Sequence, residues 1–189
     1  MDFKVIPAND YEELYRQMQL DFPKPGELAP YHAIKQNLDS GRYEAFYLCD
    51  DTNDIIVGYM VVTIPEGSRL VFGNYFAIYP ELRSKGYGTA FLNSIINKYH
   101  DSTFIIEVSD PVAEDDLELR GIAVKRISFY ERAGFTIAPT IKAKIFGADM
   151  LIMATNKYEG FSAREAMLSL YMPPTPSEFW LKNIDVVNK

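Results

Sequence analysis

A basic, glycine-containing turn, RSKGYGT from Arg83 to Thr89, is the part of the sequence best suited to binding an anion. Gly86 and Gly88 lack a Cβ, so consecutive backbone N–H groups there can point at one phosphate. A helix is expected to begin at or just after Gly86, and its N-terminus adds about half a positive charge. We call residues 83–89 the anion loop, although the same residues also suit a plain strand-to-helix turn. They match neither GxxxxGK[ST] nor GxGxxG.

Metal and thiol chemistry find no support in the residue pattern. His32 and His100 have no partners at the spacing of a metal site or a catalytic triad. Cys49 is the single cysteine, so the chain can form neither an intrachain disulfide nor a site with several thiolate ligands. We therefore expect no bound metal.

The charge balance excludes some classes of partner. The 189 residues include 19 basic and 26 acidic ones, which gives a net charge of −7. Nucleic-acid binding needs a basic surface, so it is not expected, whereas cationic small molecules are mildly favoured. No apolar run approaches the roughly 20 residues that span a bilayer, and the first residues do not resemble a signal peptide. We expect one cytoplasmic domain, residues 1–189, without a membrane partner.

Hydrophobic periodicity predicts the elements before the anion loop. Two helices are expected within residues 10–40, with Asp10 and Glu13 forming a capping box at the start of the first. Three strands joined by hairpins follow at residues 42–49, 55–64 and 69–79. The third strand is apolar on both faces, so it should be central in a sheet.

The elements after the loop continue the alternation. The loop opens a helix through Tyr99, and a strand at residues 102–109 and a helix ending near Gly134 come next. A hairpin turning near Gly147 and a terminal helix, with Ser162 and Glu165 as a capping box, complete the order. This order predicts an α+β fold, with a mostly antiparallel twisted sheet of about six to seven strands flanked by helices.

Two motifs in this order resemble one family. YPELRSKGYGTAFL, residues 79–92, resembles the diphosphate-binding motif (R/Q)xxGx(G/A) of the GNAT acyltransferase superfamily. RISFYERAGF, residues 126–135, resembles the second signature, an LY or FY pair before GF. The resemblance is specific over residues 70–135 and extends by pattern across residues 42–157. It implies the GNAT fold, acetyl-CoA as cosubstrate and N-acetyltransferase activity, in a bacterial-type member of undefined substrate.

The resemblance also implies roles for residues. Backbone groups of the third predicted strand would face the pantetheine arm, and amides of the anion loop would hold the pyrophosphate. Tyr130 would approach the thioester sulfur. Arg126 departs from the family's pattern, but it shares a helical face with Tyr130 and could therefore reach the cofactor or Glu107. The candidate cofactor-binding residues are Phe76, Ala77, Ile78, Arg83, Ser84, Lys85, Gly86, Tyr87, Gly88, Thr89, Arg126 and Tyr130.

Tyr130 is the candidate general acid and Glu107 the candidate general base. A CoA thiolate has a pKa near 8.5 and tyrosine one near 10, so proton transfer from Tyr130 is uphill by roughly 2 kcal/mol and should come late. The competing interpretation makes Tyr130 an aromatic packing residue. An amine near pKa 10.4 needs a base, and Asn74 occupies the neighbourhood of the family's usual glutamate. Glu107, inside an apolar strand, is the substitute base, or else it forms an ion pair, for example with Arg126.

The sequence thus predicts direct attack of a primary amine, from a small molecule or a peptide, on acetyl-CoA. The helices at residues 10–40 would lie on the acceptor side, and the extension at residues 158–189 would cover the sheet, close the acceptor cleft or form a dimer contact. A monomer or a homodimer is expected. A non-catalytic acyl-CoA-binding regulatory module and an O-acyltransferase stay open as alternatives.

Overall fold

The computed structural model describes residues 2–24, 26–52, 55–138, 141–155, 171 and 178–188. The chain divides into two compact units. The first unit consists of residues 1–66 and 73–98, and the second of residues 67–72 and 99–189. Strand β4 (Leu70–Ile78) therefore begins in the second unit and ends in the first.

The first unit is built on a sheet of β1 (Asp2–Val5), β2 (Tyr43–Asp50), β3 (Ile55–Thr63) and the later part of β4, in that order. β1, β2 and β3 pair antiparallel. Only short stretches of chain separate β2 from β3 and β3 from β4, as expected from the hairpin signals in the sequence.

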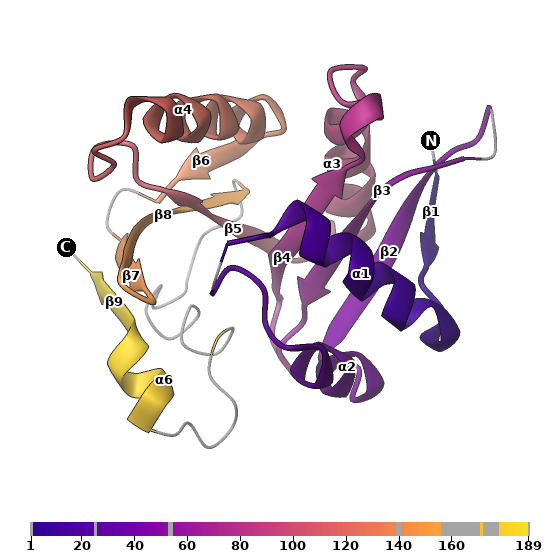
Figure 1. Ribbon diagram of the computed structural model, residues 1–189, viewed down its shortest axis with the longest axis horizontal. Coiled ribbons are helices and arrows are strands. Elements are labelled where there is room, and N and C mark those ends of the chain that lie inside the picture. Colours follow the sequence, from indigo (N-terminus) through magenta and orange to yellow (C-terminus); the bar gives the residue numbers. More distant parts are fainter. Residues whose placement is uncertain are drawn as a thin grey trace. The chain divides into compact units, whose positions relative to one another are not determined.

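Helices cover both faces of this sheet. α1 (Tyr11–Asp21) and α2 (Tyr31–Asp39) pack on one face, where their buried side chains meet Ala45, Tyr59, Val61 and Ala77 of the strands (Figure 1). α3 (Tyr87–Lys98) uses the other face, because the Phe91 ring lies 5.7 Å from that of Phe76, and side chains alternate between faces along a strand. Short 3-10 turns, η1 (Ala8–Asp10) and η2 (Pro80–Leu82), precede α1 and the anion loop.

The second unit extends from the first residues of β4. These pair parallel with β5 (Thr103–Ser109), and β5 pairs antiparallel with β8 (Ala148–Thr155). β8 also pairs with β7 (Ile141–Ile145) and β6 (Phe135–Ile137), and β7 pairs with β9 (Ile184–Asn188). α4 (Leu117–Arg132) runs alongside β5 and β6 (Figure 1), and the short α6 (Glu178–Asn183) precedes β9.

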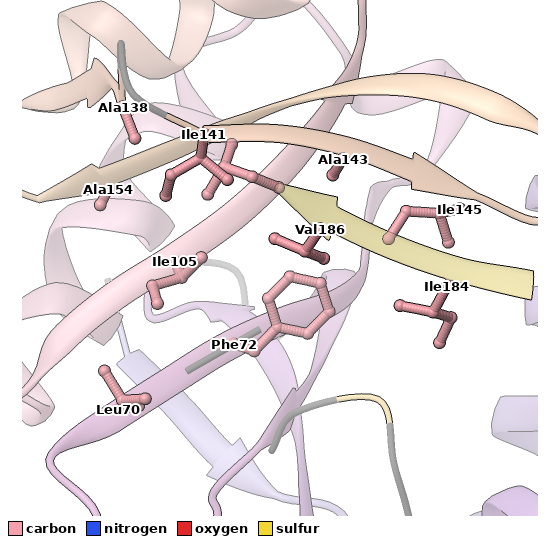
Figure 2. Packing of buried hydrophobic residues seen from close by; sticks show 11 residues of the cluster. Leu70, Phe72, Ile105, Ala138, Ile141, Ala143, Ile145, Ala154, Ile184 and Val186 are labelled. Atoms are coloured by element: carbon pink, nitrogen blue, oxygen red, sulfur yellow. The ribbon is translucent and has the colours of Figure 1, made fainter. Parts of the chain in front are cut away.

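An aliphatic core lies on the face of these strands opposite α4. Figure 2 shows Phe72 and Ile105 below the side chains of β7, with Ile184 and Val186 of β9 beside the Phe72 ring. The cluster comprises Leu70, Phe72, Ile105, Ala138, Ile141, Ala143, Ile145, Ile152, Ala154, Ile184 and Val186. Half-buried Tyr171 packs against it.

The predicted fold class is confirmed, and several details differ. Within the described residues the strands number nine, not six or seven, because β1, β6 and β9 carry no pattern long enough to be recognised. The hairpin turn is confirmed, since Phe146 (φ 48°) and Gly147 (φ 86°) both have the positive φ of a type I′ turn. The predicted capping box is wrong: Asp10 occupies the N-cap of α1 without a side-chain cap bond, and Glu13 accepts from Arg16.

The predicted terminal helix lies outside the described residues apart from Tyr171. Of the helices that the structure describes, none combines the length and apolar character needed to cross a membrane.

Candidate functional site

The anion loop in the first unit has the geometry of an exposed helix start. Residues 83–86 are exposed, and α3 follows at Tyr87. The first bond of the helix is from Ala90 N to Gly86 O, 3.1 Å long, so the preceding N–H groups of residues 87–89 have no partner inside the helix. Ser84 (φ 63°) and Gly86 (φ 85°) adopt positive φ, which favours glycine at position 86.

Two carboxylates anchor the loop within this unit. Arg83 Nε donates to the Ile78 carbonyl at 2.8 Å, and Arg83 Nη2 donates to Asp21 Oδ1 at 3.3 Å. At the helical end, the Tyr87 hydroxyl donates to Asp50 Oδ2 at 2.7 Å. The loop is therefore fixed at its first residue by α1 and at its fifth by β2. Neither carboxylate was singled out from the sequence.

Lys85 supplies the loop's second positive charge. Its residue is exposed, and it forms no ion pair with any residue that the structure describes. Arg83, in contrast, shares its charge with Asp21 while more than half of its side chain stays exposed. Lys85 is the more available of the two charges for an anion.

The end of β4 depends on a glycine of β3. A Cβ built on Gly58 would lie 2.3 Å from the Ala77 carbonyl oxygen, closer than real atoms allow. The signal for this close approach was present as a glycine inside a strand run, but Gly58 was not among the predicted residues. Of the predicted strand residues, Ala77 is buried, and Phe76 directs its ring to α3.

Asn74 has a structural partner. Its Nδ2 donates to Oγ1 of buried Thr63 at 2.5 Å, which joins β4 to β3. An amide cannot act as a base, so Glu107 is the candidate base.

Glu107 lies on β5 in the second unit, opposite Ile152. Its carboxylate Oε2 accepts a hydrogen bond from the Tyr171 hydroxyl, and the Tyr171 ring packs 5.3 Å from that of Phe72. Glu107 is half-buried, and burial raises the pKa of its carboxyl to about 8 because it disfavours the charged form. No ion pair joins Glu107 to Arg126 among the described residues, so its partner is a tyrosine and not the arginine considered from the sequence.

Tyr130 lies near the end of α4. The N-terminus of the helix is capped, because the Asp116 carboxylate accepts hydrogen bonds from the N–H groups of Glu118 (2.8 Å) and Leu119 (3.0 Å). The Tyr130 ring is half-buried and contacts Phe135, with ring centres 5.6 Å apart. Burial raises the pKa of Tyr130, and exposed Arg126 opposes that rise. The phenol therefore stays protonated as a hydrogen-bond donor across the neutral range.

The two candidate acid–base residues lie on opposite faces of β5. Phe104 packs against Phe135, which packs against Tyr130 of α4, so the Phe104 side chain lies on the face of β5 that α4 covers. Alternation then places Ile105 and Glu107 on the face of the aliphatic core (Figure 2 shows Ile105). The structure therefore does not bring the side chains of Glu107 and Tyr130 together. Across the described ranges, no cluster of three or more His, Cys, Asp or Glu residues has metal-binding geometry.

Comparison by sequence gives one family. A family model for an acetyltransferase (GNAT) domain matches residues 42–137, more than half of the 189 residues. Among curated proteins, none matches the sequence.

Solved structures share the fold at low identity. One is a protein from Bacteroides thetaiotaomicron assigned to the GNAT acetyltransferases: TM-score 0.70, 20% identity, covering 88% of this chain and 93% of that one. A Bacillus subtilis acetyltransferase in complex with CoA has a TM-score of 0.58 and 18% identity, with coverages of 81% and 96%. A dodecameric spermidine N-acetyltransferase from Vibrio cholerae has a TM-score of 0.58 and 13% identity, with coverages of 81% and 91%. At these identities the likeness shows a shared fold and nothing more specific.

Proposed function

The chain belongs to the GNAT acetyltransferase family and is an acyltransferase; from this premise we propose that it moves an acetyl group from acetyl-CoA to a primary amine. The observation that carries the proposal is the anion loop, with its helix start and its glycines at 86 and 88. The acceptor would be a small molecule or a peptide. The composition, with a single cysteine, suits a cytoplasmic location as part of this proposal.

The donor fits the residues present in the first unit. Helix-start N–H groups, the exposed charge of Lys85 and the exposed part of Arg83 suit a diphosphate. Bound acetyl-CoA would supply the acetyl group as a reactive thioester. The similar Bacillus subtilis fold was solved with CoA, which supports this donor. The proposed binding residues remain Phe76, Ala77, Ile78, Arg83, Ser84, Lys85, Gly86, Tyr87, Gly88, Thr89, Arg126 and Tyr130.

Tyr130 is the proposed acid. Its raised pKa keeps the proton on the phenol, so the hydroxyl can donate a hydrogen bond to developing negative charge on sulfur. The same raised pKa makes full proton transfer late in the reaction.

Glu107 is the proposed base. A carboxyl with a pKa of about 8 is poised near neutral pH, where it can take a proton from an amine, directly or through water. Glu107 projects from β5 on the face of the aliphatic core, and Tyr130 belongs to α4 on the other face, so the proposed base and acid would not exchange protons directly with each other.

The acceptor class rests on charge and analogy. The net charge of −7 favours cationic amines, and the similar Vibrio cholerae fold is a spermidine N-acetyltransferase. That neighbour is dodecameric; for this chain we propose a monomer or a homodimer. One observation favours a non-catalytic acyl-CoA-binding module instead: Asn74, near the usual position of the base, is engaged with Thr63.

Calorimetry with two ligands tests the donor site. Acetyl-CoA and acetylpantetheine share the thioester and the pantetheine arm, and only acetyl-CoA carries the diphosphate. We expect acetyl-CoA to bind more tightly and with stronger salt dependence. Lys85→Gln should weaken acetyl-CoA roughly threefold to tenfold, as expected for one exposed charge contact, and leave acetylpantetheine unchanged. Equal affinities for the two ligands, independent of salt, would refute a diphosphate role for the loop.

A further inference from the structure

The carboxylate of Asp21 lies where both the helix dipole and burial disfavour its negative charge. It is the last residue of α1, where the helix dipole repels a negative charge, and the last turn of α1 contains no basic residue. Its side chain is only 6% exposed. A carboxylate so deeply buried is stable only when neighbouring donors and a cation compensate for its lost hydration.

Three donors from three elements meet this carboxylate. Gln17 Nε2, one helical turn earlier, and the hydroxyl of fully buried Tyr59 on β3 both donate to Oδ2, at 3.1 Å and 3.0 Å. Arg83 Nη2 donates to Oδ1 at 3.3 Å. Burial first, and then the charge of Asp21, raise the pKa of Tyr59, so its hydroxyl remains a donor.

The arginine is the cation of this group and the first residue of the anion loop. Its Nε also donates to the Ile78 carbonyl at the end of β4. The guanidinium therefore links three points: the end of α1, the end of β4 and the start of the loop. Rotation of Arg83 away from this position would leave Oδ1 of a buried carboxylate without its positive partner.

We propose that Asp21 is a positioning residue for the anion loop, acting through the guanidinium of Arg83. The part of this inference that concerns acetyl-CoA rests on the proposed function. The part that concerns the loop's order does not, because it follows from contacts inside the first unit.

Hydrogen exchange measured by NMR tests the loop directly. The reporting amides are Arg83, which bonds Pro80 O, and Ala90, which bonds Gly86 O. We expect Asp21→Asn to speed exchange of both amides at least tenfold. Tyr59→Phe is the matched control, because it removes a hydrogen bond to the same carboxylate but leaves the bond between Oδ1 and Arg83 in place. After correction for any change in the free energy of unfolding, the exchange rates of its two loop amides should equal those of the wild type.

Two further measurements test whether Asp21 acts through Arg83. Arg83→Met, at a mostly exposed side chain, should speed the same amides and replaces Asp21→Asn if that variant does not fold. In calorimetry, Asp21→Asn should weaken acetyl-CoA at least threefold, and Asp21→Asn with Arg83→Met should be no weaker than Arg83→Met alone. Loop exchange in Asp21→Asn and Arg83→Met equal to that in Tyr59→Phe would overturn the inference. Absence of acetyl-CoA binding by the wild type would instead refute the proposed function, and exchange would still decide the role of Asp21.

Discussion

Glu107 and Tyr130 experience the same physical effect with different chemical results. Burial disfavours the charged form of each side chain and so raises both pKa values. For Tyr130 the rise starts from an ordinary value of 10.0 and fixes the phenol as a donor. For Glu107 it starts from 4.5 and ends at about 8, where the carboxyl can both hold and release a proton near neutral pH.

Tyr130→Phe tests the proposed acid. The substitution keeps the ring that packs on Phe135 and removes only the hydroxyl. We expect kcat to fall roughly 10²- to 10⁴-fold, because general acids contribute about that much. The affinity for acetyl-CoA, measured by calorimetry, should fall far less than kcat does, because Tyr130 is one of many proposed binding residues and only its hydroxyl is removed. An unchanged kcat would reduce Tyr130 to the packing residue that the sequence left as an alternative.

The pH dependence of stability tests the environment of Glu107 without any substrate. Between about pH 4.5 and pH 8 the unfolded carboxyl has lost its proton while the folded one keeps it. The folded state then binds more protons, so the free energy of unfolding should decrease as pH rises through this window, by at most about 1.4 kcal/mol per pH unit, and level off above pH 8. Urea unfolding at pH 5, 6.5 and 8 measures it.

Glu107→Gln is the matched control for that experiment. The amide cannot titrate, so the difference in stability between wild type and variant should shrink or change sign between pH 5 and pH 8. Parallel pH curves for the two proteins would contradict the raised pKa. If Glu107 is also the base, kcat/KM of the wild type should rise with pH up to about 8, and this rise should disappear in the variant.

At the scale of elements, the spacing between β3 and β4 depends on a missing side chain. The Ala77 carbonyl oxygen occupies the place of a Cβ on Gly58. Gly58→Ala must push the end of β4 away from β3, and we expect a loss of about 1–3 kcal/mol, the usual cost of overpacking. Acetyl-CoA affinity should fall as well, because residues 76–78 are the proposed pantetheine strand.

Gly121→Ala in α4 is the control for this change. No atom lies within 4 Å of a Cβ built there, and the residue is helical. Alanine should therefore stabilise the protein by about 0.5–1 kcal/mol through its better helix propensity. Thermal unfolding and calorimetry of both variants give the comparison. Equal stability of the two variants would mean that β3 and β4 can separate at no cost.

The longer elements could be predicted because each has a local cause. Helix α2 buries Ile34 and Leu38 at the expected spacing, and the β7–β8 hairpin turns at Gly147 because its conformation needs positive φ. β1, β6 and β9 could not be predicted, since each has only three to five residues and gains its place from a partner strand. The capping box failed because a 3-10 turn at residues 8–10 changes the entry to α1.

At the scale of the whole chain, the conformation of the anion loop could be predicted from the sequence, because it depends on neighbouring residues. The glycines at 86 and 88 and the helix start after them are local features. The partners of the site could not be predicted, because Asp21 and Arg83 are 62 residues apart, and Glu107 and Tyr171 are 64 apart. Nothing in the sequence around Asp21 or Tyr171 indicates those contacts, which arise only when distant segments pack.

The net charge of −7 leads to an expectation about the acceptor. Among primary amines of similar size, those with a second positive charge should have the lower KM, and the advantage should diminish as ionic strength rises. Steady-state kinetics at 20 mM and 300 mM salt, roughly 21 Å and 6 Å of screening length, would show it. Equal KM values at both salt concentrations would mean that surface charge does not select the acceptor.

The central claim is acetyl transfer from acetyl-CoA to an amine, and its most direct test is release of free CoA thiol in the presence of a panel of primary amines. We expect thiol release that depends on both the protein and an amine, with the acetylated amine identified by mass spectrometry. Tyr130→Phe should bind acetyl-CoA and release thiol at least 10²-fold more slowly. Tight binding of acetyl-CoA with no thiol released for any amine in the panel would contradict the claim and favour the non-catalytic acyl-CoA-binding module.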